Sequence, residues 1–459
     1  MLFHEIPEAF RKGNLELWCP KMIIRKQGGE QSNEKMGSGI IRQDDKKQIK
    51  FILLERSPSS LSDIIKKKIG EIFEVGKIIP GDKYYSLEAI DISGNTWKAD
   101  RFLISQSIGP EGSIIRGNIY VLEQKKPYKF VNDFISLEIF HDVNLPLILD
   151  SKELKKMANG EEYINRKIAI INVCETEFKI MNENGILTIS AEAEKRELPE
   201  NIETRIIEAL QFVTSKTISW GILQKGNSIT NFRSSDRESY PTNISMPIDF
   251  EHADRDGKWC WRLFGKYIEH IYKFKGENSF EMHPLSAWLN FIRNTSVGSI
   301  FTKGLGLGIA VEGILKCEYS KNNAKCNENI DDFEKMINHV KSFEGSENIR
   351  IRTIGAINYM KQIRAKDRLY ALKEEGVVRE EDVKAWDNIR NRGAHARPPE
   401  GEEMQVWIDS CYKTKVLINH LIFNAIGYKG KYTDYGNRTD SWPTRVYPLS
   451  GNVEAILKS

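Results

Sequence analysis

The hydrophobic pattern changes its period once along the chain, and this change limits the fold more than any other feature. Up to about residue 250, short segments rich in β-branched and aromatic residues are separated by turn residues such as Gly28-Gly29 and Gly94-Asn95. This arrangement is typical of strands in a sandwich or barrel. From about Asp254 the apolar residues recur at helical spacing over long segments joined by short loops, which predicts an antiparallel helical bundle.

The sequence therefore predicts an α+β protein. Its predicted parts are a β-rich N-terminal domain at 1–250, an all-α helical-bundle C-terminal domain at 251–430 and an irregular aromatic and basic tail at 431–459. The expected strands are 14–18, 48–54, 84–92, 97–104, 113–122, 136–140, 168–174, 185–193 and 218–223. The expected helices are 199–214 in the first domain and then 261–274, 284–294, 306–317, 330–343, 353–375, 380–391 and 402–426.

The composition excludes several classes of protein. The formal net charge is +3 over 459 residues, so any contact with nucleic acid must come from a local basic patch. The six cysteines include no C-x-x-C pair, which indicates reduced thiols and argues against a zinc ribbon. Residues 1–12 contain no apolar leader, and no segment approaches the ~20 apolar residues of a membrane span. We expect a cytoplasmic protein with no membrane partner.

Arg390, Asn391 and His395 form the most specific motif of the chain. The predicted helix runs into Arg390, and Gly393 stands where a glycine would end it, so His395 is expected just beyond the last turn. The guanidinium and the imidazole would then converge on one phosphate, and a helix C-terminus favours a protonated imidazole. Arg-Asn-x-x-x-His is expected by chance only roughly 0.03 times in a chain like this. The competing interpretation is an arginine and a histidine that merely cap a helix.

This motif, at a helix end within an all-α domain, resembles the ribonuclease signature of HEPN domains (higher eukaryotes and prokaryotes nucleotide-binding). The resemblance covers roughly residues 255–430. The segments 311–313 and 423–434 are similar to the Apea-like branch, and 13–20 with 37–39 is similar to the β-rich N-terminal domain of that branch. The resemblance implies a metal-independent endoribonuclease of bacterial anti-phage (abortive infection) defence.

In the implied mechanism, the RNA supplies its own nucleophile, the 2′-hydroxyl. His395 would move the proton, Arg390 would hold and neutralise the phosphoryl oxygens, and Asn391 would orient one of these groups. One histidine cannot serve both sides of the phosphate, so a homodimer with a shared cleft is expected. Glu312, alone on an apolar helix, either pairs with Arg390 and fixes its rotamer or reaches solvent. We expect no metal and no cofactor, and a regulatory N-terminal domain that senses a trigger such as a phage-derived protein.

Basic residues near the motif are candidate RNA ligands. Lys361, Arg364 and Arg368 follow the helical spacing i, i+3, i+7 and would track phosphates along one helix face. An ordinary solvated helix face explains the same pattern equally well. Arg392 and Arg397, inside and after the motif, are further candidates.

Two other functions remain open at this point. In the first, the helical domain is a catalytically silent scaffold that binds nucleotide or protein partners. Alternatively, Asp100, Glu123 and Lys125 would carry metal-dependent nuclease chemistry in the β-rich domain. The histidines on helical patterns show no spacing typical of metal ligands and are expected to be structural; these are His270, His283, His339 and His420.

Overall fold

The structure is a computed structural model of the chain, and it divides into two compact units. It describes residues 5–28, 34–55, 76–109, 112–126, 131, 133–140, 143, 145–147, 167–183, 185–194, 197–234, 245–277, 281–320, 330–360, 364–394, 400–401, 403–438, 441–451 and 453–458. Unit 1 comprises Met1–Val143, Leu149–Pro199 and Ile218–Ser239. Unit 2 comprises Asn144–Ile148, Glu200–Thr217 and Tyr240–Ser459.

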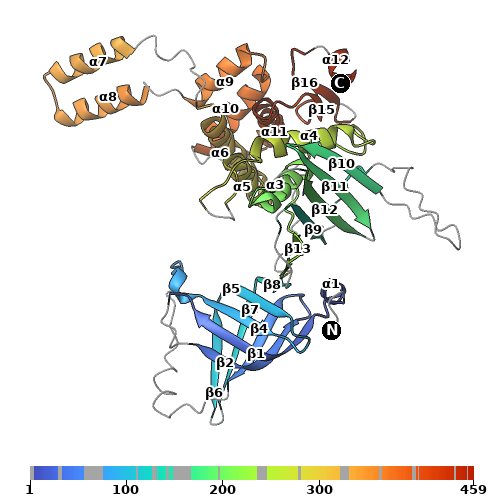
Figure 1. The fold of residues 1–459 in the computed structure, drawn as a ribbon. Helices are drawn as coiled ribbons and strands as arrows, with labels where there is room; N and C mark the ends of the chain where they lie inside the picture. The colour runs from blue at the N-terminus through green and yellow to red at the C-terminus, as the bar shows by residue number, and fades with distance from the viewer. Residues whose placement is uncertain are drawn as a thin grey trace. The chain divides into compact units, whose positions relative to one another are not determined.

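Unit 1 is built on one antiparallel sheet. Among the described residues the sheet has 14 strands in the order β10-β11-β12-β9-β13-β14-β8-β5-β4-β1-β2-β3-β7-β6 (Figure 1). The strands are β1 Glu16–Lys26, β2 Lys35–Gln43, β3 Ile49–Glu55, β4 Tyr85–Ile90, β5 Thr96–Phe102, β6 Ile104–Gly109, β7 Gly112–Ile119, β8 Val121–Lys125, β9 Phe134–Ile139, β10 Lys167–Val173, β11 Thr176–Glu183, β12 Ile186–Ala193, β13 Ile222–Lys225 and β14 Ile229–Arg233. The strands that the sequence did not predict are β2, β6, β8, β11 and β14; only the first two residues of β8 fall within the expected strand 113–122.

One core cluster of unit 1 is formed by residues of α1 and of strands β1 to β5, β7, β8, β13 and β14. Alternate residues are buried along β3 and β9, as expected for a sheet that covers a core on one side. Trp97 is fully buried in this core and donates from Nε1 to Asp91 Oδ2 at 3.0 Å. Phe10 of α1 (Ile6–Arg11) packs on Phe232 with ring centroids 5.1 Å apart. The short helix therefore covers part of the same core.

Unit 2 is mainly helical. Its helices are α3 Ile202–Thr214, α4 Lys258–Ile271, α5 Pro284–Ser296, α6 Ile300–Glu318, α7 Ile330–Ser342, α8 Glu347–Met360, α9 Ala365–Glu374, α10 Glu380–Ala394, α11 Glu403–Ala425 and α12 Val453–Lys458. Helix α6 is apolar on nearly all sides, which is typical of a buried central helix, and it contacts α5, α10 and α11 (Figure 1). The α+β prediction is thus confirmed. None of the described helices is long and apolar enough to cross a membrane.

The segment 431–459 is part of unit 2 rather than an irregular tail. It contains the strand pair β15 (Gly430–Thr433) and β16 (Thr444–Tyr447). Asp434 is fully buried and accepts hydrogen bonds from Arg379 at 2.7 and 3.0 Å and from Arg445 at 2.9 Å. These ion pairs attach the segment to the start of α10. Helix α3, which the sequence placed in the first domain, also belongs to unit 2.

The predicted helix 353–375 is wrong, because the structure has two helices there. Helix α8 ends at Met360 and α9 begins at Ala365. Arg364 has an extended backbone (ψ 155°), and its N–H donates to Asp367 Oδ2 at 3.2 Å. This hydrogen bond is half of a capping box, which stabilises a new helix start.

The prediction that Gly393 ends its helix is also wrong, since α10 continues to Ala394. A glycine inside a helix costs only about 1 kcal/mol relative to alanine, which is too little to end a helix by itself. Arg390 consequently lies one turn before the end of α10.

Candidate functional site

Arg390 and Asn391 both lie on the exposed side of α10. The helix is buried at Ile389 and at Trp386, which lies one turn before Arg390. Trp386 Nε1 donates to the carbonyl oxygen of Gly308 on α6 at 3.1 Å, so it fixes α10 against α6. This packing determines which way the last turns of α10 face.

Arg390 forms an ion pair with Glu312 of α6. Its Nε donates to Glu312 Oε1, and both side chains are 42% exposed. The guanidinium also lies over the ring of Trp386, with 5.8 Å from Cζ to the ring centroid. The hydrogen bond to Glu312 raises the pKa of Arg390. Of the two outcomes that the sequence left open for Glu312, the structure has the ion pair.

The ion pair uses the Nε edge of the guanidinium. The N–H groups of Nη1 and Nη2 lie outside this hydrogen bond. These groups form the planar fork with which arginine binds a phosphate at two points. Glu312 can therefore hold the rotamer of Arg390 while the fork binds an anion.

His395, Arg397 and Lys361 lie outside the described residues. His395 follows directly in sequence after the last residue of α10, Ala394. Its predicted role is therefore neither supported nor contradicted by side-chain geometry.

The other predicted RNA ligands have partners within the protein. Arg392 donates to Glu403 Oε2 of α11 at 2.9 Å, and Arg364 pairs with Asp367 at 3.0 Å. Arg368 donates from Nη1 to the carbonyl oxygen of Leu315 at 3.2 Å. Because α8 ends before Lys361 and α9 begins after Arg364, the predicted single helix face for these basic residues does not exist.

The residues of the alternative metal-dependent site lie on neighbouring strands of unit 1. Asp100 is on β5, Glu123 and Lys125 are on β8, and these strands pair with each other. Two of these residues form an ion pair with each other: Glu123 Oε1 lies 3.7 Å from Lys125 Nζ. In register, Glu123 faces Lys98 rather than Asp100.

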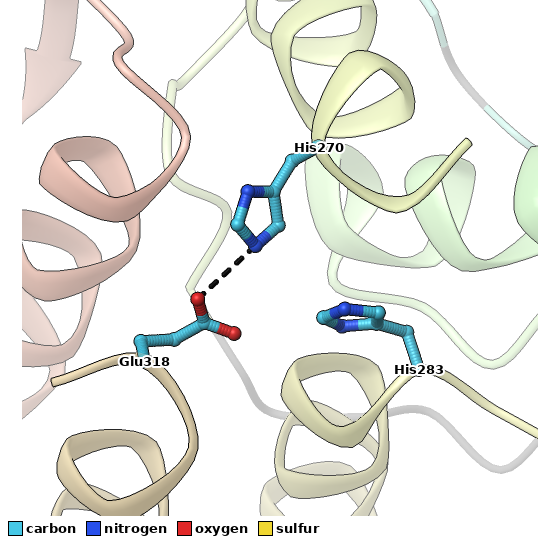
Figure 2. Close-up of side chains that lie close together, drawn as sticks. All are labelled: His270, His283 and Glu318. Atoms are coloured by element: carbon cyan, nitrogen blue, oxygen red, sulfur yellow. Dashed lines mark ion pairs between the residues drawn. The ribbon is translucent and has the colours of Figure 1, made fainter. Parts of the chain in front are cut away.

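A cluster that sequence reasoning missed lies at the C-terminal end of α6. His270 of α4, His283 at the N-cap of α5 and Glu318 of α6 point toward one another (Figure 2). His270 Nε2 is 3.1 Å from Glu318 Oε2, and one potential ligand atom from each residue lies within 4.8 Å of the other two. The sequence separations of 13 and 35 residues carry no recognisable spacing, so no local signal could have identified the group.

The electrostatics of this cluster follow from its partial burial. Burial, and then the neighbouring His270, lower the pKa of His283 to about 4. Burial raises the pKa of Glu318, but the hydrogen bond and charge of His270 outweigh it, and the net pKa is lowered. At neutral pH the cluster thus combines a neutral imidazole with a carboxylate.

Comparison of the chain with protein-family models, with curated proteins and with solved structures finds no match. Function must therefore be inferred from the residues and their geometry.

Proposed function

We propose that this protein is a metal-independent endoribonuclease of the HEPN type that acts in anti-phage defence. The observation that carries the proposal is Arg390: exposed near the end of α10, held by Glu312 through Nε, with the phosphate-binding fork outside that contact. The Arg-Asn-x-x-x-His motif supplies the rest of the chemistry.

The proposed reaction needs acid–base catalysis and charge stabilisation. The 2′-hydroxyl of the RNA attacks the adjacent phosphorus, and the 5′-oxygen of the next nucleotide leaves. Arg390 stabilises the charge on the phosphoryl oxygens, and His395 transfers a proton. Asn391, exposed beside Arg390, orients the phosphate or the imidazole by hydrogen bonding. The products carry a 2′,3′-cyclic phosphate and a 5′-hydroxyl.

The experiment is an RNA cleavage assay of the full chain in Mg²⁺ and in excess EDTA, with a matched 2′-deoxy oligonucleotide. We expect similar cleavage rates in both buffers, cyclic phosphate ends and an intact deoxy substrate. A thermal melt in each buffer verifies that the protein is folded. Loss of cleavage in EDTA while the protein stays folded, or cleavage of the deoxy substrate, would contradict the proposal.

A catalytically silent scaffold is the second candidate. The ion pair of Arg390 with Glu312 favours it, because the pair already neutralises the arginine without any ligand. A scaffold would show no cleavage of total cellular RNA above that of an Arg390→Ala, His395→Ala double variant.

A further inference from the structure

We infer that His270, His283 and Glu318 form a binding site for a transition-metal dication of the zinc class. The three residues come from three helices, α4, α5 and α6, and their potential ligand atoms lie within 4.8 Å of one another. Two imidazoles and one carboxylate are a ligand set that zinc accepts, with the remaining position left to water. This inference does not depend on the proposed function.

The distances suit a bound ion. Ligand atoms at about 2.0–2.2 Å from zinc and separated by a tetrahedral angle lie about 3.4 Å apart. His270 Nε2 and Glu318 Oε2 are already 3.1 Å apart. The ring of His283 lies beside the carboxylate of Glu318 (Figure 2), and its potential ligand atom is within 4.8 Å of those of the other two residues.

The surroundings of the three side chains favour stable binding of an ion. The side chains of His270 and Glu318 are 24% and 11% exposed, so the site is shielded but accessible. Glu318 has no lysine or arginine within ion-pair distance among the described residues; its ion-pair partner there is His270, and its Oε1 also accepts a hydrogen bond from Cys317 Sγ at 3.7 Å. A cation that binds here would neutralise this carboxylate and replace an imidazole–carboxylate hydrogen bond by two coordinate bonds.

Metal binding at His283 would alter the start of α5. Nδ1 of His283 accepts a hydrogen bond from the N–H of Leu285 at 3.2 Å and so caps the helix. A neutral imidazole has a single nitrogen lone pair, so coordination through either nitrogen removes this cap. The ion would link the N-terminus of α5 directly to α4 and α6, and the N–H of Leu285 would need another acceptor.

The site is separate from the Arg390–Glu312 ion pair. Glu312 and Glu318 both belong to α6, but six residues of helix separate them by about 9 Å along the axis. The metal would therefore act on the packing of α4, α5 and α6 and not on a phosphate held by Arg390.

The test is zinc binding to the purified full-length protein after removal of metal with EDTA and dialysis. Isothermal titration with zinc chloride should show one ion per chain with micromolar or tighter affinity, and zinc should raise the melting temperature. Cobalt(II) should give the visible absorption bands of a four-coordinate ion with nitrogen and oxygen ligands. None of these readouts requires RNA cleavage.

The variants locate the site. His270→Ala, His283→Ala and the nearly isosteric Glu318→Gln should each weaken zinc binding by at least about tenfold. His339→Ala is the matched control, because His339 is an exposed histidine on α7 and should leave the affinity unchanged. Circular dichroism of each metal-free variant verifies its fold. Absence of zinc binding, or equal affinity of wild type and Glu318→Gln, would overturn the inference.

Discussion

The proposed chemistry depends on the guanidinium group of Arg390. Arg390→Lys keeps the charge but loses the planar fork, so we expect RNA cleavage to fall by about 100-fold or more. An exposed ion pair contributes about 1 kcal/mol or less, so the free energy of unfolding should hardly change. Single-turnover cleavage and urea denaturation measure the two quantities. Full activity of the lysine variant would mean that Arg390 acts only as a diffuse charge.

His395→Ala should abolish cleavage by removing the group that transfers the proton. The melting temperature of the variant, measured beside its cleavage rate, separates lost chemistry from lost folding. Near-normal cleavage by a stable variant would refute the catalytic assignment of His395.

Glu312 acts in this proposal as a positioning residue, since it contacts Arg390 and not the RNA. Glu312→Gln keeps a hydrogen-bond acceptor but removes the charge that holds the guanidinium. We expect kcat to fall by about tenfold, with a smaller change in KM, because misplacement of Arg390 weakens binding of the transition state most. If kcat of this variant equals that of the wild type, Glu312 does not position Arg390.

At the scale of the elements, the packing of α6 depends on its close approach to α5. A Cβ added at Gly313 would lie 2.0 Å from Cε2 of Trp288, so Gly313→Ala should lower the free energy of unfolding by about 1–3 kcal/mol. Gly355 on α8 is the matched control, since a Cβ there meets no atom within 4 Å. Gly355→Ala should stabilise the protein by about 0.5–1 kcal/mol. Urea denaturation of both variants checks the pair, and a Gly313→Ala protein as stable as wild type would show that the helices separate at little cost.

The packing of α11 against the β15–β16 pair predicts a pH dependence. His420 is fully buried, with ring centroids 4.9 Å from Tyr432 and 5.4 Å from Tyr447. Burial, and then the positive charge of Arg379, lower the pKa of His420 to about 3. The unfolded chain, with a histidine pKa near 6.5, binds the proton more readily, so this contribution to stability is complete above that pH and is lost as pH falls toward 3.

From pH 7 to pH 5 the loss from His420 amounts to about 2 kcal/mol. His420→Phe removes the titrating group, so its free energy of unfolding should fall less than that of the wild type over this range. Urea denaturation at both pH values measures the difference. Identical pH dependence in the two proteins would mean that His420 is protonated equally in the folded and unfolded states.

At the scale of the whole molecule, the proposal requires two chains. In-line attack needs a base on one side of the phosphate and an acid on the other, and a twofold axis would bring two copies of His395 to one cleft. Equal co-expression of wild-type and His395→Ala chains should leave about a quarter of the wild-type activity, because mixed dimers have only one histidine. Size-exclusion chromatography verifies the dimer. A remaining activity of one half, or full activity of a monomer, would exclude the shared cleft.

The sequence by itself determined the α+β class, most of the helices and the Arg-Asn-x-x-x-His motif. These features are local: the period of apolar residues and the spacing within one helix turn are set by neighbours along the chain. The strands β2 and β14 were missed because β2 contains two glycines and β14 is only five residues long, so both lack a clear alternation.

Only the tertiary structure decided the long-range contacts. It joined Glu312 to Arg390 across 78 residues, attached Asp434 to Arg379, and brought together His270, His283 and Glu318 from three helices. Such contacts depend on how apolar helix faces pack, since α6 packs against α5, α10 and α11 at once. No periodicity encodes which side chains then meet, because packing and not spacing along the chain determines the distance between them.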